Sequence, residues 1–214
     1  MAREGLSNLI VALVLTVVST YLIFASDGAI IWRILATLSG LLLLFTLYFF
    51  RDPEREIKQD PNHILSPGDG TIVAIEEVDD PEMGPARKII FFMSPLNVHI
   101  NRFPISGTIE SVDYRYGSFK AAYAPDASEV NEQNILLIRN DHLAVRFSQI
   151  AGVMARRIVS YAREGDEAVQ GERYGLIKFG SRMDVTFPRE CEVKVGLREP
   201  VRGGITVLAE APSV

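Results

Sequence analysis

The chain has 214 residues, a formal net charge of -5 and one cysteine, Cys191. Positive and negative residues alternate, as in residues 51–56, so no basic patch supports a nucleic-acid partner. A single cysteine excludes an internal disulfide, agrees with a reducing compartment, and has no partner at metal-ligand spacing. We therefore predict neither a nucleic-acid partner nor a bound metal.

Two long apolar runs open the chain, at residues 6–25 and 29–50. Each is close to the roughly 20 residues that a helix needs to cross the core of a bilayer. The connection at 26–28 is short and polar, and neither run ends in the small-residue cleavage site of a signal peptide. We predict that residues 1–50 form a transmembrane hairpin of two helices.

The charges around the hairpin predict its orientation. Arg3 precedes the first run, Arg51 and Arg55 follow the second, and the connection has no Lys or Arg. The positive-inside rule then places both ends, and the domain that follows, on the cytoplasmic side of the cell membrane. Arg33 lies near the connection, so shallow insertion of the pair in the membrane interface remains an alternative to spanning.

Residues 51–214 are enough for one domain with a sizeable core, here a catalytic domain that begins with a polar linker at 52–62. Short apolar or alternating runs then recur between Gly, Pro and Asn-Asp breaks. The predicted strands are 71–75, 88–93, 108–116, 135–139, 143–150, 158–161, 176–179, 183–187, 191–195 and 205–209. Asn140-Asp141 predicts a hairpin turn, and residues 119–134 have no clean period, which fits a functional loop or a short helix.

A weak internal repeat runs proline, glycine, then a β-branched strand, at residues 66–73, 104–109 and 199–207. This form, and the tight turn at 164–172, resemble the barrel-sandwich folds of lipoyl and biotinyl carriers. The fold class that we predict is mostly β (α+β): a single catalytic domain with barrel-sandwich-like elements, preceded by the two-helix hairpin. Fold alone does not determine function.

The strand pattern at 175–184 is broken at its centre by Gly180-Ser181. The Ser181 hydroxyl could attack the Gly180 carbonyl, move the acyl group from nitrogen to oxygen, and leave a pyruvoyl group after elimination and hydrolysis. Glycine leaves that carbonyl unshielded and tolerates strained backbone geometry. The alternative interpretation of the same pair is a β-bulge or turn between two strands.

A serine that attacks a carbonyl needs a base, usually a histidine that a carboxylate orients. Of the three histidines, His63 lies in the linker and His142 follows a turn Asp, so both are expected to be exposed. His99 lies between Val98 and Ile100 in a strand-like run and projects to the opposite face. It is either the base or a hydrogen-bonded structural histidine.

Asp69 is the candidate for the orienting carboxylate. It lies between two glycines before a predicted strand. The alternative is that Asp and Gly are there only because turns favour them.

Read in order, four motifs resemble the phosphatidylserine decarboxylase family, specifically its short bacterial and archaeal type. They are Ser-Pro-Gly-Asp-Gly at 66–70, Asn-Val-His-Ile-Asn-Arg-Phe-Pro at 97–104, Ala-Arg-Arg-Ile at 155–158 and Gly-Leu-Ile-Lys-Phe-Gly-Ser-Arg-Met-Asp at 175–184. The resemblance covers essentially all of the chain after the hairpin. The ordered set is far more specific than any one motif.

The resemblance implies that the Gly180–Ser181 bond is cleaved by the protein itself. Ser181 then becomes a covalent pyruvoyl cofactor, and Asp69, His99 and Ser181 match the family's Asp-His-Ser self-processing triad. The implied reaction is decarboxylation of phosphatidylserine to phosphatidylethanolamine, as a step of phospholipid biosynthesis. The implied partners are the phospholipid in its membrane and the chain's own two fragments, which form a heterodimer; a higher oligomer is left open.

Two departures from the longer family type are present. Those members carry a second histidine three positions before the triad histidine, and here that residue is Leu96. The group that donates the proton during decarboxylation is therefore left open, with His99 able to serve both steps. The cleavage motif reads Phe-Gly-Ser-Arg instead of Leu-Gly-Ser-Thr, which we interpret as a subtype difference.

Two other functions fit part of the pattern. A pyruvoyl decarboxylase of a related serine lipid or an amino acid would share the cleavage, although an enzyme for a soluble amino acid has no use for a membrane anchor. A non-enzymatic, membrane-anchored barrel-sandwich module would share the Pro-Gly strand starts without needing the triad. It would also be expected to carry a lysine at a hairpin tip, which is not obvious here.

Overall fold

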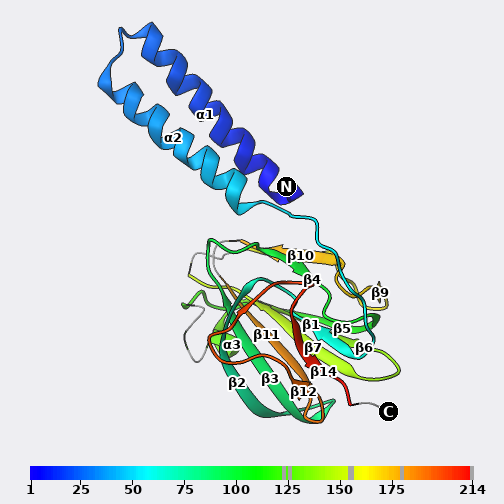
Figure 1. The fold of residues 1–214 in the computed structure, drawn as a ribbon. Coiled ribbons are helices and arrows are strands. Elements are labelled where there is room, and N and C mark those ends of the chain that lie inside the picture. Colours follow the sequence, from blue (N-terminus) through cyan, green and yellow to red (C-terminus); the bar gives the residue numbers. More distant parts are fainter. Residues whose placement is uncertain (122–123, 125–126, 154–156, 179–180, 213–214) are drawn as a thin grey trace. The chain divides into compact units, whose positions relative to one another are not determined.

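The computed structural model describes residues 1–214 except 122–123, 125–126, 154–156, 179–180 and 213–214. The chain forms two compact units, Met1–Glu54 and Arg55–Val214 (Figure 1).

The first unit is a pair of apolar helices, as predicted. After a short 3-10 turn, η1 (Arg3–Gly5), the helices are α1 (Leu6–Ala25) and α2 (Ile30–Phe49). Asp27 and Gly28 reverse the chain between them with φ angles of 51° and 78°, and the hydroxyls of Ser19 and Ser39 lie 3.3 Å apart across the pair. Both helices are long and apolar enough to cross a membrane, which supports membrane association.

The second unit consists almost entirely of strands. They are β1 (His63–Leu65), β2 (Gly70–Asp80), β3 (Gly84–Met93), β4 (Ile100–Arg102), β5 (Gly107–Arg115), β6 (Gln133–Arg139), β7 (Ala144–Ile150), β8 (Ile158–Ser160), β9 (Glu167–Ala168), β10 (Arg173–Ile177), β11 (Ser181–Pro188), β12 (Glu192–Val193), β13 (Pro200–Val201) and β14 (Val207–Glu210). One short helix, α3 (Ala127–Val130), precedes β6.

These strands form one large and two small antiparallel sheets. The large sheet has eight strands in the order β13-β2-β3-β11-β7-β6-β5-β9 and curls into a half-barrel (Figure 1). The small sheets have the orders β1-β14-β12 and β4-β10-β8. The buried core draws side chains from all three sheets, among them Phe91 of β3, Tyr174 of β10 and Leu208 of β14. The predicted mostly-β class is confirmed.

Each predicted strand segment overlaps a strand, because an alternating or continuous apolar run of four or more residues is a local signal. The predicted hairpin turn joins β6 to β7, and the Asn140 side-chain oxygen accepts hydrogen bonds from the backbone of His142 and Leu143. Among the two- and three-residue strands, β8 and β12 lie in predicted segments, whereas β1, β4, β9 and β13 do not, since so few residues show no period. Phe179, the expected end of one strand, lies outside the described residues.

The segment that reads as a polar linker is fixed to the second unit from Arg55 onward. Ile57 fills the space beside two glycines: a Cβ on Gly171 or Gly204 would lie 2.4 or 2.8 Å from its side chain. The Asp60 amide donates to the Gln170 side chain at 2.8 Å. His63, expected to be exposed, begins β1 and is partly buried.

Candidate active site

Ser181 is the first residue of β11, a central strand of the large sheet between β3 and β7. It pairs with Met93 at the end of β3 and is 0% exposed. Its hydroxyl donates to the Met93 sulfur at 3.4 Å, and a thioether is a weak acceptor. Because the hydroxyl is the donor in this contact, the contact does not use the lone pairs of the Ser181 oxygen.

The strand before Ser181 belongs to another sheet. β10 ends at Ile177 and pairs with β4 and β8, whereas β11 begins at Ser181 and pairs with β3 and β7. The chain thus changes sheets between residues 177 and 181. Gly180, on the other side of the predicted cleavage bond, lies outside the described residues.

His99 lies immediately before β4 and is 2% exposed. Its backbone oxygen accepts a hydrogen bond from the Ile177 amide at 3.3 Å, so it is held beside the end of β10. Its Nδ1 lies 3.0 Å from the Asn97 carbonyl oxygen. Because a carbonyl can only accept, this contact requires the proton on Nδ1 and leaves Nε2 of the neutral ring as a proton acceptor.

Asp69 lies in the loop that precedes β2. Among the described residues, its carboxylate accepts hydrogen bonds from Arg55 (2.7 Å to Oδ1 and 2.9 Å to Oδ2) and from the Gly203 amide (2.8 Å), rather than from His99. The Asp69 and Arg55 side chains are only 13% and 11% exposed. Arg55 was not predicted, because it lies in a run of mixed charges typical of a solvated linker.

Backbone and methionine contacts bring the three predicted residues onto adjacent segments. A Cβ on Gly68, next to Asp69, would lie 3.2 Å from Met93, the same residue that contacts Ser181. In the same loop, the Pro67 carbonyl accepts a hydrogen bond from the amide of Arg102 in β4, the strand that follows His99. The loop of Asp69 is thus in contact with β4 and with the residue that contacts Ser181.

A chain of buried amides lies beside these residues and was not predicted. Asn134 donates to Gln149, and Gln149 donates to Asn101, each at 2.9 Å. The Asn101 amide nitrogen is then directed to the Met183 sulfur at 3.2 Å. Asn101 belongs to the motif around His99, but polar residues in strands give no sequence signal of burial.

The opposite face of β11 carries a buried ion pair. Arg182 donates to Asp184 through two nitrogens, at 2.7 and 3.1 Å, and Ser128 donates to the same carboxylate at 2.8 Å. Since side chains alternate along a strand, this pair lies on the face away from Ser181 and Met183. It connects α3 to the strand that Ser181 begins.

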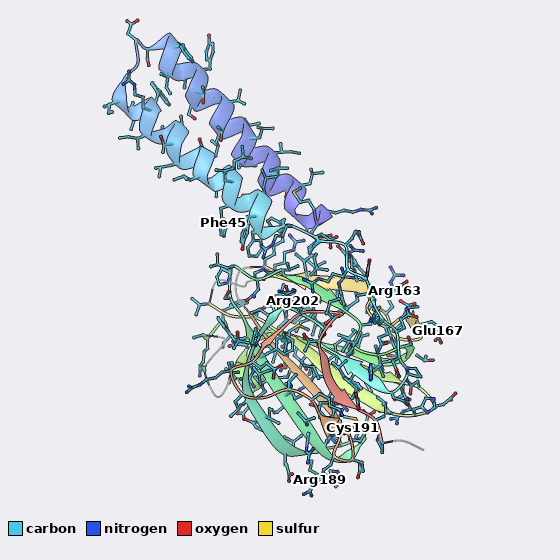
Figure 2. All side chains as sticks on the ribbon, viewed as in Figure 1. Phe45, Arg163, Glu167, Arg189, Cys191 and Arg202 are labelled. Atoms are coloured by element: carbon cyan, nitrogen blue, oxygen red, sulfur yellow. The ribbon has the colours of Figure 1, made fainter. Side chains whose placement is uncertain are left out.

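Cys191 lies near β12, at the end of the domain away from β4 and β10 (Figures 1 and 2). Burial and, to a smaller extent, Glu190 raise the pKa of its thiol, Arg87 opposes them, and the resulting pKa is about 11. Such a thiol is not a nucleophile at neutral pH. Within the described ranges, no group of three or more His, Cys, Asp or Glu side chains is placed to hold a metal ion.

Comparison with known proteins identifies the family of the chain. The sequence profile described as phosphatidylserine decarboxylase matches residues 42–209. The chain is 43% identical over 211 residues to a phosphatidylserine decarboxylase proenzyme of Carboxydothermus hydrogenoformans, which covers 97% of this chain and 95% of the relative. The proenzyme of Cupriavidus pinatubonensis is 42% identical over 216 residues, with 100% and 96% covered.

A third relative, the phosphatidylserine decarboxylase proenzyme of Solibacter usitatus, is 48% identical over 169 residues, which cover 79% of this chain and 80% of the relative. The matches span the predicted site as well as most of the domain. The family predicted from the ordered motifs is confirmed: the chain belongs to the phosphatidylserine decarboxylase family.

Proposed function

We propose that the chain is a proenzyme that cleaves itself between Gly180 and Ser181 and then decarboxylates phosphatidylserine to phosphatidylethanolamine. Family membership supports the reaction, and the relatives are named as proenzymes. The observation that carries the proposal is the position of Ser181: a buried serine at the first residue of a central strand, just after the chain changes sheets.

This position is compatible with a cut in the chain. β11 pairs with β3 from Ser181 to Pro188 and with β7 from Arg182 to Thr186. β10 is held separately by β4 and β8. Both new ends would keep their sheet hydrogen bonds, so the two fragments would stay together as a heterodimer.

The proposed cleavage uses Nε2 of His99 as the base. His99 removes the proton of the Ser181 hydroxyl and returns it to the nitrogen of residue 181, as the serine oxygen bonds to the Gly180 carbonyl carbon and the C–N bond breaks. Loss of the α-proton of residue 181 then breaks the ester, leaving a carboxylate on Gly180 and dehydroalanine at 181. Water converts dehydroalanine to a pyruvoyl group and ammonia. Asp69 is the third member of the proposed triad and acts from the adjacent loop, where Arg55 and the Gly203 amide hold its carboxylate, while the Asn97 carbonyl holds the His99 ring.

A pyruvoyl group fits the site better than an ordinary new chain end would. Hydrolysis alone would leave an ammonium group at residue 181, which is 0% exposed, and burying an unpaired charge is costly. A pyruvoyl group is uncharged. Once formed, it supplies the electron-accepting carbonyl that the loss of carbon dioxide requires.

His99 remains the candidate for moving protons during decarboxylation. Leu96, at the position of the longer type's second histidine, is 63% exposed and cannot titrate. The serine that His99 first deprotonates no longer exists in the processed enzyme, which leaves the imidazole available for the second step. The hairpin would tether this domain at the cytoplasmic face of the membrane, where a diacyl substrate is at high effective concentration.

Mass spectrometry of the denatured full-length protein tests the proposal. We expect a chain that ends at Gly180 and a second chain whose first residue carries a pyruvoyl group in place of Ser181. Ser181→Ala should remain a single chain, since no hydroxyl is left to attack, and His99→Ala should cleave much more slowly. An uncut wild-type chain would contradict the proposal, and activity on free serine instead of phosphatidylserine vesicles would favour the amino-acid decarboxylase.

A further inference from the structure

The segment that follows the hairpin is fixed at both ends to the catalytic domain. Ile57 packs where Gly171 and Gly204 leave room, and the amide of Asp60 is bonded to Gln170. At the start of the segment, Arg55 reaches the loop of Asp69. Residues 55–60 are therefore a strap on the domain, and Arg55 is its first contact.

Arg55, Asp69 and Gly203 form a closed ring of hydrogen bonds. Arg55 donates to both oxygens of Asp69 and also to the Gly203 carbonyl, while the Gly203 amide donates back to Asp69. A fork of two parallel bonds fixes the plane of a carboxylate, which a single donor cannot do. The ring thus fixes the direction in which Asp69 points.

The ring also holds the loop of Gly68, which approaches the residue that contacts Ser181. Gly68 packs against Gly203, where a Cβ on Gly203 would lie 2.9 Å from the Gly68 Cα. A Cβ on Gly68 would lie 3.2 Å from Met93, the residue in contact with the Ser181 hydroxyl. Displacing Asp69 would therefore move the packing around the proposed nucleophile.

We propose that Arg55 is a positioning residue for self-cleavage, which acts by holding Asp69 and its loop against the residues that contact Ser181. The inference rests on the proposed self-cleavage. It makes the polypeptide immediately after the hairpin part of the processing machinery, although Arg55 itself touches no reacting atom.

The test compares three full-length variants. Arg55→Met keeps the length of the side chain without its charge and fork, and we expect self-cleavage to slow about 10- to 100-fold, the range that small misplacements cause. Arg55→Lys keeps the charge without the fork and should be slowed less. Arg146→Met is the control: it removes a similar two-bond pair, between Arg146 and Asp80 in the large sheet, and the folded variant should cleave at the wild-type rate.

Two further readouts separate positioning from a general loss of structure. Guanidinium ions added to Arg55→Met should restore part of the cleavage rate, whereas sodium chloride at the same ionic strength should not. Asp69→Asn should slow self-cleavage in the wild-type background but cause little further slowing in the Arg55→Met background, because the effects of groups that act as a unit are non-additive.

Equal cleavage rates for Arg55→Met and Arg146→Met would overturn the inference while leaving the proposed function intact. An uncut wild type would instead contradict the proposed function. If Arg55→Met does not fold, the test rests on Arg55→Lys. A self-cleavage rate equal to that of wild type would overturn the role of the fork, and a slower rate in a folded protein would support it.

Discussion

Single residues determine how closely the segments of this site approach, and Gly203 is the clearest case. Its amide and carbonyl both take part in the ring with Arg55 and Asp69. Its missing side chain is what allows the backbone to lie against Gly68. The sequence shows only a glycine pair at 203–204, which predicts a turn but not its contact.

We predict that Gly203→Ala slows self-cleavage and lowers the free energy of unfolding by about 1–3 kcal/mol, the usual cost of overpacking. The added Cβ meets backbone atoms of Gly68, which cannot rotate away. Gly196→Ala is the matched control, because its nearest neighbour would be Glu199 at 3.8 Å. Fragment time courses measure the first effect, and urea unfolding in a Ser181→Ala background measures the second; identical behaviour of the two alanine variants would refute the prediction.

At the scale of elements, a charged pair joins strands that are not neighbours. Asp80 ends β2, and Arg146 lies in β7, with β3 and β11 between those strands in the sheet order. Arg146 donates to both oxygens of Asp80, at 2.7 and 3.2 Å. Burial by itself would raise the pKa of Asp80, but the hydrogen bonds and charge of Arg146 and the hydrogen bonds from the amides of Glu82 and Met83 outweigh it and lower the pKa below its ordinary value.

Asp80→Asn should therefore destabilise the domain at pH 7 by about 1–3 kcal/mol. The folded-state pKa is lowered, so the stabilisation is present above the unfolded-state pKa of about 3.9 and is lost as the pH falls through the folded-state value. The difference between wild type and variant should shrink below about pH 4.

Urea unfolding at several pH values, again in the Ser181→Ala background, measures this difference. Asp113→Asn serves as a control because its pair with Arg115 is exposed, and its effect should stay below about 1 kcal/mol. A difference between Asp80→Asn and wild type that does not change with pH would contradict the assignment.

At the scale of the whole molecule, cleavage would put the strands of one core onto two chains. The fragment 181–214 would contribute β11 at the centre of the large sheet, β13 at its edge, and β12 and β14 of a small sheet. Val185 and Leu208 of this fragment are fully buried in the common core.

We predict that the two fragments of the processed enzyme remain together in native conditions and separate only in denaturant. Removing the short fragment would expose the core and leave β3 and β7 without their shared partner. Native mass spectrometry and size-exclusion chromatography measure the association. Loss of the short chain from a still-folded long chain would contradict the prediction.

Removal of residues 1–50 should leave self-cleavage intact, because Arg55, Asp69, His99 and Ser181 all follow the hairpin and the second unit has its own core. Turnover of phosphatidylserine in vesicles should nevertheless fall about 10- to 100-fold more than turnover of a short-chain soluble analogue, since tethering is lost. Paired assays on the two substrates measure this. Equal losses would show that the hairpin shapes the active site, and no loss on vesicles would show that the domain binds membranes by itself.

The sequence by itself determined the local features of this protein. The apolar runs, the longer strands and the Asn140-Asp141 turn follow from composition and periodicity within short windows. The family follows from the order of a few motifs, and those motifs named Asp69, His99 and Ser181 as candidates. Their triad roles remain predictions.

Only the tertiary structure decided which distant segments meet. Arg55 and Gly203 lie 148 residues apart in the chain, yet both hold Asp69. The Asn97 carbonyl, at the Nδ1 of His99, takes the position expected for a carboxylate. Such contacts depend on strand order and on close backbone approach, which are set by packing of the whole domain; no local pattern of residues encodes them.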